Sequence, residues 1–174
     1  PRLAQLVIDK PDEEWRTLND IAAAQGNNFN AQEIANRVHE AVDQWGTDED
    51  AIFTALQNLK PFQTRVLRAA YQDTFDTSIE SDLESDMSGR ELQRAQALLA
   101  NNQARADAIA MRQAMHGNWE GEWFDLGGLS GLGTDNDAIH KMMRERTDEE
   151  RAAIDREYMA LSPDGRSFVE DVHS

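Results

Sequence analysis

The stretch Trp-Gly-Thr-Asp-Glu-Asp-Ala-Ile at residues 45–52 returns in altered form as Gly-Thr-Asp-Asn-Asp-Ala-Ile at residues 133–139. In each copy a glycine, which readily adopts the left-handed conformation that ends a helix, precedes a threonine and acidic residues, which favour the first turn of a new helix. Each copy therefore predicts a helix, a tight loop and a second helix. Similar stretches repeated along a chain indicate a repeat architecture, so this pair decides the fold.

The similarity between the two copies continues beyond the loop. Nine positions after the threonine both copies have an apolar residue, Leu56 in the first and Met143 in the second. Twenty-four positions after it both have a tyrosine, at Tyr71 and Tyr158. One helical plan therefore appears twice and predicts an all-α protein built from two repeats.

The first repeat, residues 31–101, predicts five helices and no strand. Capping residues, a proline and apolar positions at helical spacing set the boundaries of these helices. Residues 1–30 predict an N-terminal helical segment that is interrupted at Pro11. The five helix starts are expected at Asn30 with Glu33 as capping box, at Thr47 as N-cap, at Pro61, near residue 78, and at Ser88 with Glu91 as a second capping box.

The second repeat, residues 102–174, departs from this plan in two ways. It carries an insertion at 118–131 between its first helix and its loop, and the sequence stops inside the expected fourth helix, so the fifth is missing. Thr147 is expected to cap its third helix, and residues 162–165 predict a turn before the fourth. A truncated repeat leaves apolar surface uncovered, so either a longer array or another element would cover it.

The composition limits the function. Among 174 residues, 17 lysines and arginines stand against 33 aspartates and glutamates, a formal charge of −16. This charge argues against nucleic acid as a partner and against unaided adhesion to anionic lipid, because both depend on protein cations. It is compatible with binding a cation. No apolar run approaches the roughly 20 residues of a membrane span, and we expect a cytoplasmic protein with peripheral membrane association.

Enzymatic chemistry has no positive signal in the sequence. The chain has no cysteine, hence no thiolate nucleophile or disulfide framework. Its four histidines are scattered, and none belongs to a His-Glu-x-x-His zinc motif. We therefore expect a protein that is not an enzyme.

The loops resemble the annexin repeat. That family's motif is Gly-x-Gly-Thr-Asp-Glu, followed about 40 residues after the second glycine by an acidic residue and then a Ser/Thr-Gly pair. The second copy has both glycines, Gly131 and Gly133. The first copy has Gly46 and, 40 residues later, Asp86, just before Ser88 and Gly89. The resemblance implies annexin-like repeats of about five helices each, the second of them truncated.

The resemblance also implies a Ca²⁺ site at each loop. Main-chain carbonyls are the hard oxygen ligands that Ca²⁺ prefers, and a carboxylate is needed to compensate its charge. In the second copy the expected acidic residue would fall at position 175, beyond the sequence. The implied ligands are the carbonyls of Val42, Gln44 and Gly46 with the carboxylate of Asp86 in the first copy, and the carbonyls of Leu129, Gly131 and Gly133 in the second.

Aromatic residues near the loops suggest contact with a membrane or another partner. Trp45 resembles the tryptophan of one annexin repeat type, which enters the lipid interface from the loop apex. The insertion contributes Trp119, Trp123 and Phe124. These residues either anchor the protein in the headgroup zone, which tryptophan favours, or pack over the incomplete second repeat.

Two functions remain open at this point. The first is Ca²⁺-dependent, peripheral binding to anionic phospholipid membranes. The second is a calcium-independent scaffold or assembly module whose partner is a protein or a second copy of the chain. Annexin-like repeats also occur in bacterial proteins, some associated with contractile injection systems. The second reading is favoured by Gln44 in place of the first loop glycine, by the missing acid of the second copy and by the insertion.

Overall fold

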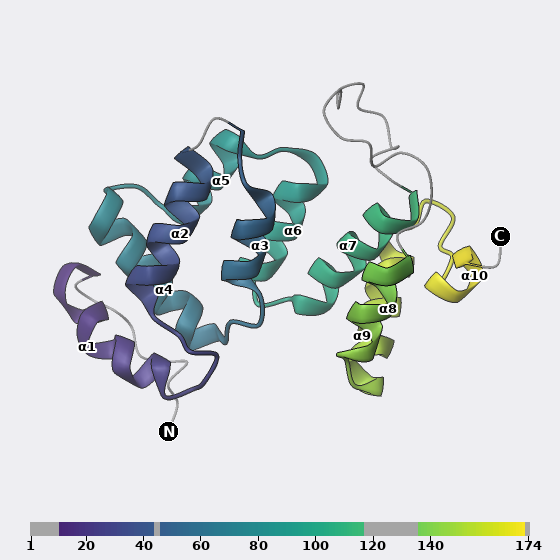
Figure 1. Cartoon of the computed structure of the whole chain (residues 1–174), viewed down its shortest axis with the longest axis horizontal. Helices are drawn as coiled ribbons and strands as arrows, with labels where there is room; N and C mark the ends of the chain where they lie inside the picture. Colours follow the sequence, from purple (N-terminus) through teal and green to yellow (C-terminus); the bar gives the residue numbers. More distant parts are fainter. Residues whose placement is uncertain (1–10, 44–45, 117–135, 173–174) are drawn as a thin grey trace. The chain divides into compact units, whose positions relative to one another are not determined.

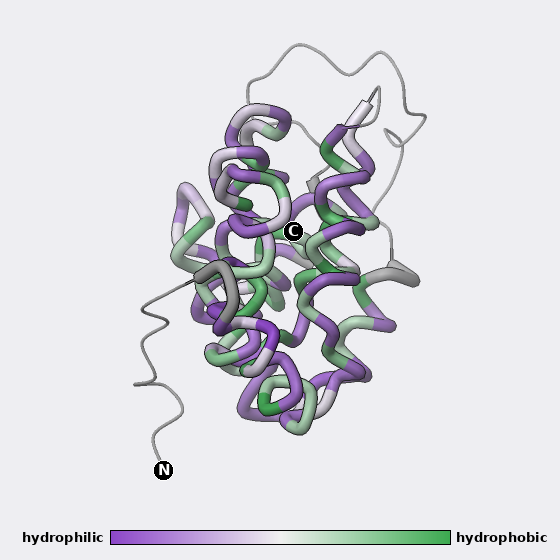
Figure 2. The backbone as a smooth tube through the Cα atoms, turned by 90° about the vertical axis from the view of Figure 1, so that its left-hand side faces the viewer, coloured by the Kyte–Doolittle hydropathy of each residue, from purple (hydrophilic) through white to green (hydrophobic). Residues whose placement is uncertain are grey.

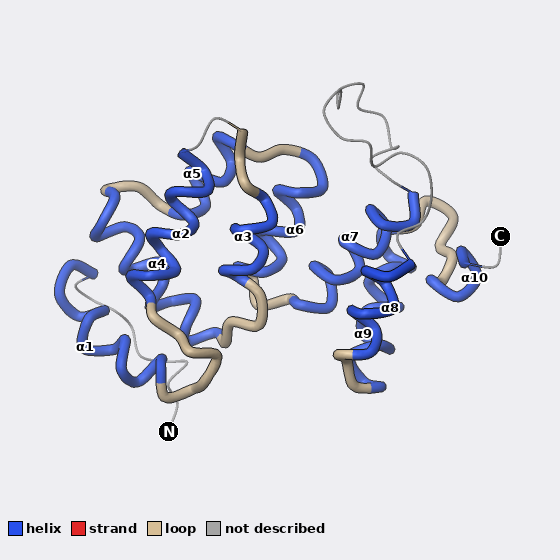
Figure 3. The backbone as a smooth tube through the Cα atoms, viewed as in Figure 1, coloured by secondary structure: helices blue, strands red, loops and turns tan. Residues whose placement is uncertain are grey.

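The computed structural model describes residues 11–43, 46–116 and 136–172 of the chain (Figure 1). Throughout these residues the secondary structure is helix, turn or loop, and Figure 3 shows no strand in them. The chain divides into two compact units, Pro1–Gln103 and Ala104–Ser174. The prediction of an all-α fold is confirmed.

The described residues of the first unit form six helices, and five of them follow residue 30, as the sequence predicts. Each begins close to a predicted cap or proline. The elements are α1 (Pro11–Ala23), α2 (Ala31–Asp43), α3 (Glu49–Leu56), α4 (Pro61–Phe75), α5 (Ile79–Asp86) and α6 (Gly89–Leu99).

Helix α4 is the centre of the first unit, because α1, α2 and α5 all pack against it. Helix α3 lies between α2 and α6. Apolar and polar stretches alternate along these helices (Figure 2), as expected when each buries one face. The largest completely buried apolar side chains of this unit are Tyr71, Ile52, Leu56, Leu67, Ile79, Leu83 and Val38.

Side-chain hydrogen bonds join α1 to α4. The indole Nε1 of Trp15 donates to Asp73 Oδ2 at 3.0 Å. The buried amide of Gln63 donates to the carbonyls of Ala22 at 3.0 Å and Gly26 at 2.9 Å, where α1 ends. The described part of the N-terminal segment therefore belongs to the same compact unit as the first repeat.

The second unit contains fewer and shorter elements among its described residues. They are α7 (Gln103–His116, which begins at the boundary), α8 (Asn136–Arg144), α9 (Asp148–Leu161) and α10 (Phe168–Val172). Its core consists of Ala108, Met111, Ile139, Ile154 and Tyr158. None of the helices in the described parts of the chain has the length and apolar character needed to cross a membrane.

Several local predictions are confirmed. The Asn30 side chain accepts a hydrogen bond from the Glu33 backbone N–H at 3.1 Å, as an N-cap should. Thr147 and Glu150 form the reciprocal capping box of α9. Residues 162–165 form a turn, with Gly165 at a φ of +69°.

Two predictions at helix starts are wrong: Thr47 is not an N-cap, and Ser88 does not form a capping box. The N-cap of α3 is Asp48, whose carboxylate accepts from the Ala51 N–H at 3.0 Å, because the Thr47 hydroxyl bonds elsewhere. Ser88 is the N-cap of α6 by position but makes no side-chain cap bond. The residue after it, Gly89, has a φ of +54°, outside the helical region, so the backbone at this helix start lacks capping-box geometry.

Candidate metal centre

The loop between α2 and α3 contains the described glycine of the first repeat motif. Gly46 is exposed and has a φ of +89°, which L side chains rarely adopt. Among the described residues, chain neighbours aside, no atom lies within 4 Å of the position that a Cβ would occupy. A glycine is therefore required here by backbone conformation, and the space around it is open to a ligand.

A hydrogen bond joins this loop to the end of α5. The Thr47 hydroxyl donates to the main-chain carbonyl of Asp86 at 3.2 Å, across 39 residues of sequence. The Asp48 N–H donates to the Ala41 carbonyl at 3.0 Å and ties the loop back to α2. Gly46 and Asp86, which the sequence predicted as partners, thus lie on segments in direct contact.

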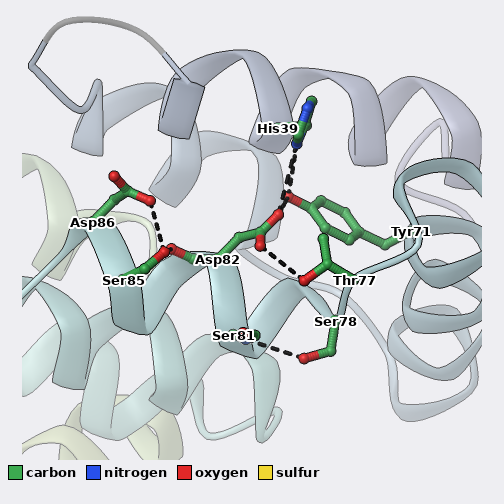
Figure 4. A network of polar contacts seen from close by, with 8 residues as sticks. All are labelled: His39, Tyr71, Thr77, Ser78, Ser81, Asp82, Ser85 and Asp86. Atoms are coloured by element: carbon green, nitrogen blue, oxygen red, sulfur yellow. Dashed lines mark hydrogen bonds and ion pairs between the residues drawn. The ribbon is translucent and has the colours of Figure 1, made fainter.

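The side chain of Asp86 is exposed at the C-terminal end of α5 (Figure 4). Its Oδ2 accepts a hydrogen bond from the Ser85 hydroxyl at 2.9 Å. A carboxylate at this end of a helix faces the negative pole of the helix dipole, which is unfavourable. A bound cation would offset both negative charges, so carbonyl and carboxylate oxygens at this place fit Ca²⁺.

A polar cluster holds the other end of α5 (Figure 4). The Tyr71 hydroxyl donates to Asp82 Oδ2 at 2.8 Å, and the Thr77 hydroxyl donates to Asp82 Oδ1 at 2.9 Å. The Nδ1 of His39 lies 3.3 Å from the Tyr71 oxygen and 3.7 Å from Asp82 Oδ2. The ring of His39 stacks on Phe75 with centroids 3.8 Å apart. Three helices, α2, α4 and α5, therefore meet at Asp82.

The electrostatics of this cluster keep Tyr71 in its neutral form. Burial raises the pKa of the Tyr71 phenol far above its ordinary value, and the hydrogen bond to Asp82 and the charges of Asp82 and Asp86 raise it further. The hydroxyl is therefore a permanent donor to Asp82.

The second unit repeats this contact. The Tyr158 hydroxyl donates to Asp171 Oδ2 at 2.5 Å, and the Tyr158 ring packs edge-on against Phe168 with centroids 5.7 Å apart. The two tyrosines occupy the same place in the repeat, but the sequence analysis assigned no role to them or to the aspartates that they contact. The signal was an acidic residue at the same place in the fourth helix of each copy.

The structure brings some of the predicted ligands together and leaves others outside its description. Val42 lies buried in the last turn of α2, just before the loop. Among the described residues no three His, Asp or Glu side chains converge on a metal position. A cation at this loop would thus depend on main-chain carbonyls and Asp86. The predicted residues Gln44, Trp45, Trp119, Trp123, Phe124, Leu129, Gly131 and Gly133 lie outside the described residues.

An acidic cleft of about 460 Å³ lies between α2 and α3, beside the loop. Its polar lining includes Glu40 and Arg37 from α2, the cap residue Asp48, and Asp50 from α3. The carboxylates outnumber the single arginine, so the cleft adds negative potential next to the loop.

These features define a class of protein: an all-α repeat protein in which a glycine loop contacts the acidic end of a helix. The family model for annexins matches residues 33–95, from α2 to α6. Human annexin A4 is 30% identical over 154 residues, which are 88% of this chain and 42% of the relative. Mouse annexin A13 is 28% identical over 144 residues, 83% of this chain and 40% of the relative.

The chain belongs to the annexin family. It spans about two fifths of the length of the curated relatives that it matches. Among solved structures, chicken annexin V matches 78% of this chain and 38% of its own, with 24% identity and a TM-score of 0.41. Annexins in general bind Ca²⁺ and phospholipid.

Proposed function

We propose that this protein is a non-enzymatic, peripheral membrane-binding protein that attaches to anionic phospholipid in a Ca²⁺-dependent manner. The loop between α2 and α3 is the proposed attachment point in the first unit. The carbonyls of Val42, Gln44 and Gly46 and the carboxylate of Asp86 would hold the ion, and the lipid phosphate would complete its coordination. The ion supplies the positive charge that the loop and the lipid both lack.

The observation that carries this proposal is the hydrogen bond from Thr47 to the Asp86 carbonyl. It ties a glycine loop with an open backbone to a helix end with an exposed carboxylate, and these are the two parts that the family's site requires. The net charge of −16 supports the dependence on calcium. Without a bridging cation, an acidic protein and an anionic membrane repel each other.

Sedimentation with vesicles of phosphatidylserine and phosphatidylcholine tests the proposal. We expect the wild-type chain to pellet with vesicles in Ca²⁺ and to remain in the supernatant with chelator. D86N should raise the Ca²⁺ concentration needed for half-maximal binding. D76N, which removes an equal charge at an exposed site before α5, is the matched control and should bind as wild type does. Vesicle binding that is the same with and without chelator would contradict the proposal.

One observation favours the alternative, a calcium-independent scaffold with a protein partner. The second unit has an apolar cavity of about 240 Å³ lined by Met111, Met143, Ile154 and Phe168, with Val169 at its edge 60% exposed. Apolar surface of this kind is typical of protein contacts. Self-association or vesicle-independent assembly that chelator does not change would favour this alternative.

A further inference from the structure

We infer that Tyr71 and Asp82 are positioning residues of the proposed cation site: by fixing the rotation of α5, their hydrogen bond sets the direction in which Asp86 presents its carboxylate. The inference rests on the proposed function and extends it to residues that do not touch the ion. It concerns the described cluster around Asp82 and the end of α5 (Figure 4).

The spacing of two aspartates on α5 couples their directions. Asp82 and Asp86 are four residues apart in the eight-residue helix α5. Residues at this spacing lie on the same face, separated by about 6 Å along the axis and about 40° around it. A rotation of α5 that moved Asp82 would therefore move Asp86 by nearly the same angle.

Helix α5 is held by two kinds of contact, apolar packing and directional hydrogen bonds. Its two buried apolar residues, Ile79 and Leu83, bind it to the core, but apolar contacts are not directional. The bonds to Asp82 are directional, and both of its carboxylate oxygens are engaged, by Tyr71 and by Thr77. Arg68 of α4 adds a further directional bond, to Glu80 in the first turn of α5. These directional bonds, more than the apolar contacts, select one rotation of the helix.

The two ends of α5 are thereby linked to different partners. At Asp82 the helix is held to α4 by Tyr71 and lies against His39 of α2. At Asp86 its main-chain carbonyl accepts the bond from Thr47 in the glycine loop. The rotation of α5 therefore sets both the contact of the Asp86 carbonyl with the loop and the direction of the Asp86 carboxylate. Loss of the bond at Asp82 should weaken cation binding, although Asp82 does not touch the ion.

The second unit supplies a matched control. Tyr158 is completely buried, as Tyr71 is, and it makes the same bond to Asp171 in α10. Tyr158 and Asp171 belong to the second unit, whereas Gly46 and Asp86 belong to the first. Y158F should thus remove an equivalent hydrogen bond without disturbing the site at Gly46.

The experiment compares the Ca²⁺ concentration for half-maximal binding to phosphatidylserine vesicles with the melting temperature in chelator. For Y71F we expect a rise of about three- to tenfold, the range that corresponds to one hydrogen bond. For Y158F we expect a decrease in melting temperature similar to that of Y71F, and no change in the calcium requirement. V66A, a core truncation in α4, controls for a general loss of stability in the first unit and should leave the requirement unchanged.

Three outcomes overturn the inference. The first is an unchanged calcium requirement in a folded Y71F, and the second is an equal rise in V66A. The third is a wild-type chain that binds no vesicles in Ca²⁺. This outcome would overturn the proposed function as well, and the wild-type measurement alone distinguishes it from the other two. If Y71F does not fold, T77V removes the other bond to Asp82 and should raise the requirement by a smaller factor.

Discussion

The two units share a helical plan but stabilise equivalent positions with different chemistry. Asp107 and Arg146 of the second unit form an ion pair at 2.7 Å, with side chains only 5% and 15% exposed. By the repeat spacing, the first unit has Ile34 and Leu59 at the same places. Both of these apolar side chains are partly buried. One repeat plan therefore accepts either apolar residues or a buried ion pair at these positions, and an ion pair is the more costly to break on one side.

The largest expected effect comes from breaking the ion pair. D107A should cost about 3–5 kcal/mol of unfolding free energy, because it leaves the Arg146 guanidinium buried without its carboxylate. The double variant D107I/R146L, which copies the first unit, should restore most of this loss. Urea denaturation measures both, and a double variant no more stable than D107A would show that the two units are not equivalent at this position.

Truncation of a core side chain at equivalent positions of the two units should have the next largest effect on the free energy of unfolding. L67A in α4 should cost about 2–5 kcal/mol, and I154A in α9 should fall near the lower end of that range. Leu67 is completely buried and lines none of the cavities described above, whereas Ile154 borders the apolar cavity of the second unit, where surrounding side chains can relax. Equal losses in urea denaturation would mean that the second core is as closely packed as the first.

Substitutions at two glycines with positive φ distinguish an effect on stability from an effect on calcium binding. G46A and G165A should each cost about 1–2 kcal/mol, because alanine is strained at φ values of +89° and +69°. Apart from its chain neighbours, no described residue lies within 4 Å of either added Cβ, so we expect conformational strain to dominate the effect. Only G46A should raise the calcium requirement in vesicle sedimentation, and a similar rise for G165A would separate Gly46 from the site.

The smallest effect is a difference in acid sensitivity. Glu150 receives hydrogen bonds from the backbone and hydroxyl of Thr147, which lower its pKa, as does the charge of Arg146. This stabilisation is fully present above the ordinary glutamate pKa and is lost as the pH falls through the lowered pKa of the folded state. In the first unit the neutral Gln63 occupies the same cap position.

Thermal melting from pH 7 down to pH 3 tests this difference. Acidification should lower the melting temperature of the wild-type chain more than that of E150Q, whose amide does not titrate. An identical pH dependence in both proteins would assign the acid sensitivity to other carboxylates, such as Asp164 and Glu170, whose pKa values are also lowered by local hydrogen bonds.

Much of the fold could be predicted from local sequence, because periodicity, prolines and capping residues act over a few positions. The start of α4 at Pro61 and the capping box at Thr147 are of this kind. The role of Thr47 could not be predicted. A threonine after a glycine can cap its own helix or bond elsewhere, and the choice depended on the carbonyl of Asp86, 39 residues away.

The candidate site was only half accessible to sequence reasoning. The distance from Gly46 to Asp86 in sequence indicated a partnership, and the structure places their segments in contact. The cluster at Asp82 was missed because its members come from separate places in the chain and share no motif. Tyr71 lies in α4, His39 in α2, and Thr77 in the loop before α5. Only the recurrence of a Tyr and an Asp in both copies could have revealed it.

The buried amide of Gln63 has a consequence for how the first unit opens. Its oxygen accepts the Lys60 N–H at the start of α4, while its nitrogen donates to the carbonyls of Ala22 and Gly26 at the end of α1. One side chain therefore closes two helix ends, so detachment of α1 and fraying of α4 form a single cooperative event with shared hydrogen-exchange protection. Glu150 closes only its own helix start, because a carboxylate has no N–H to donate.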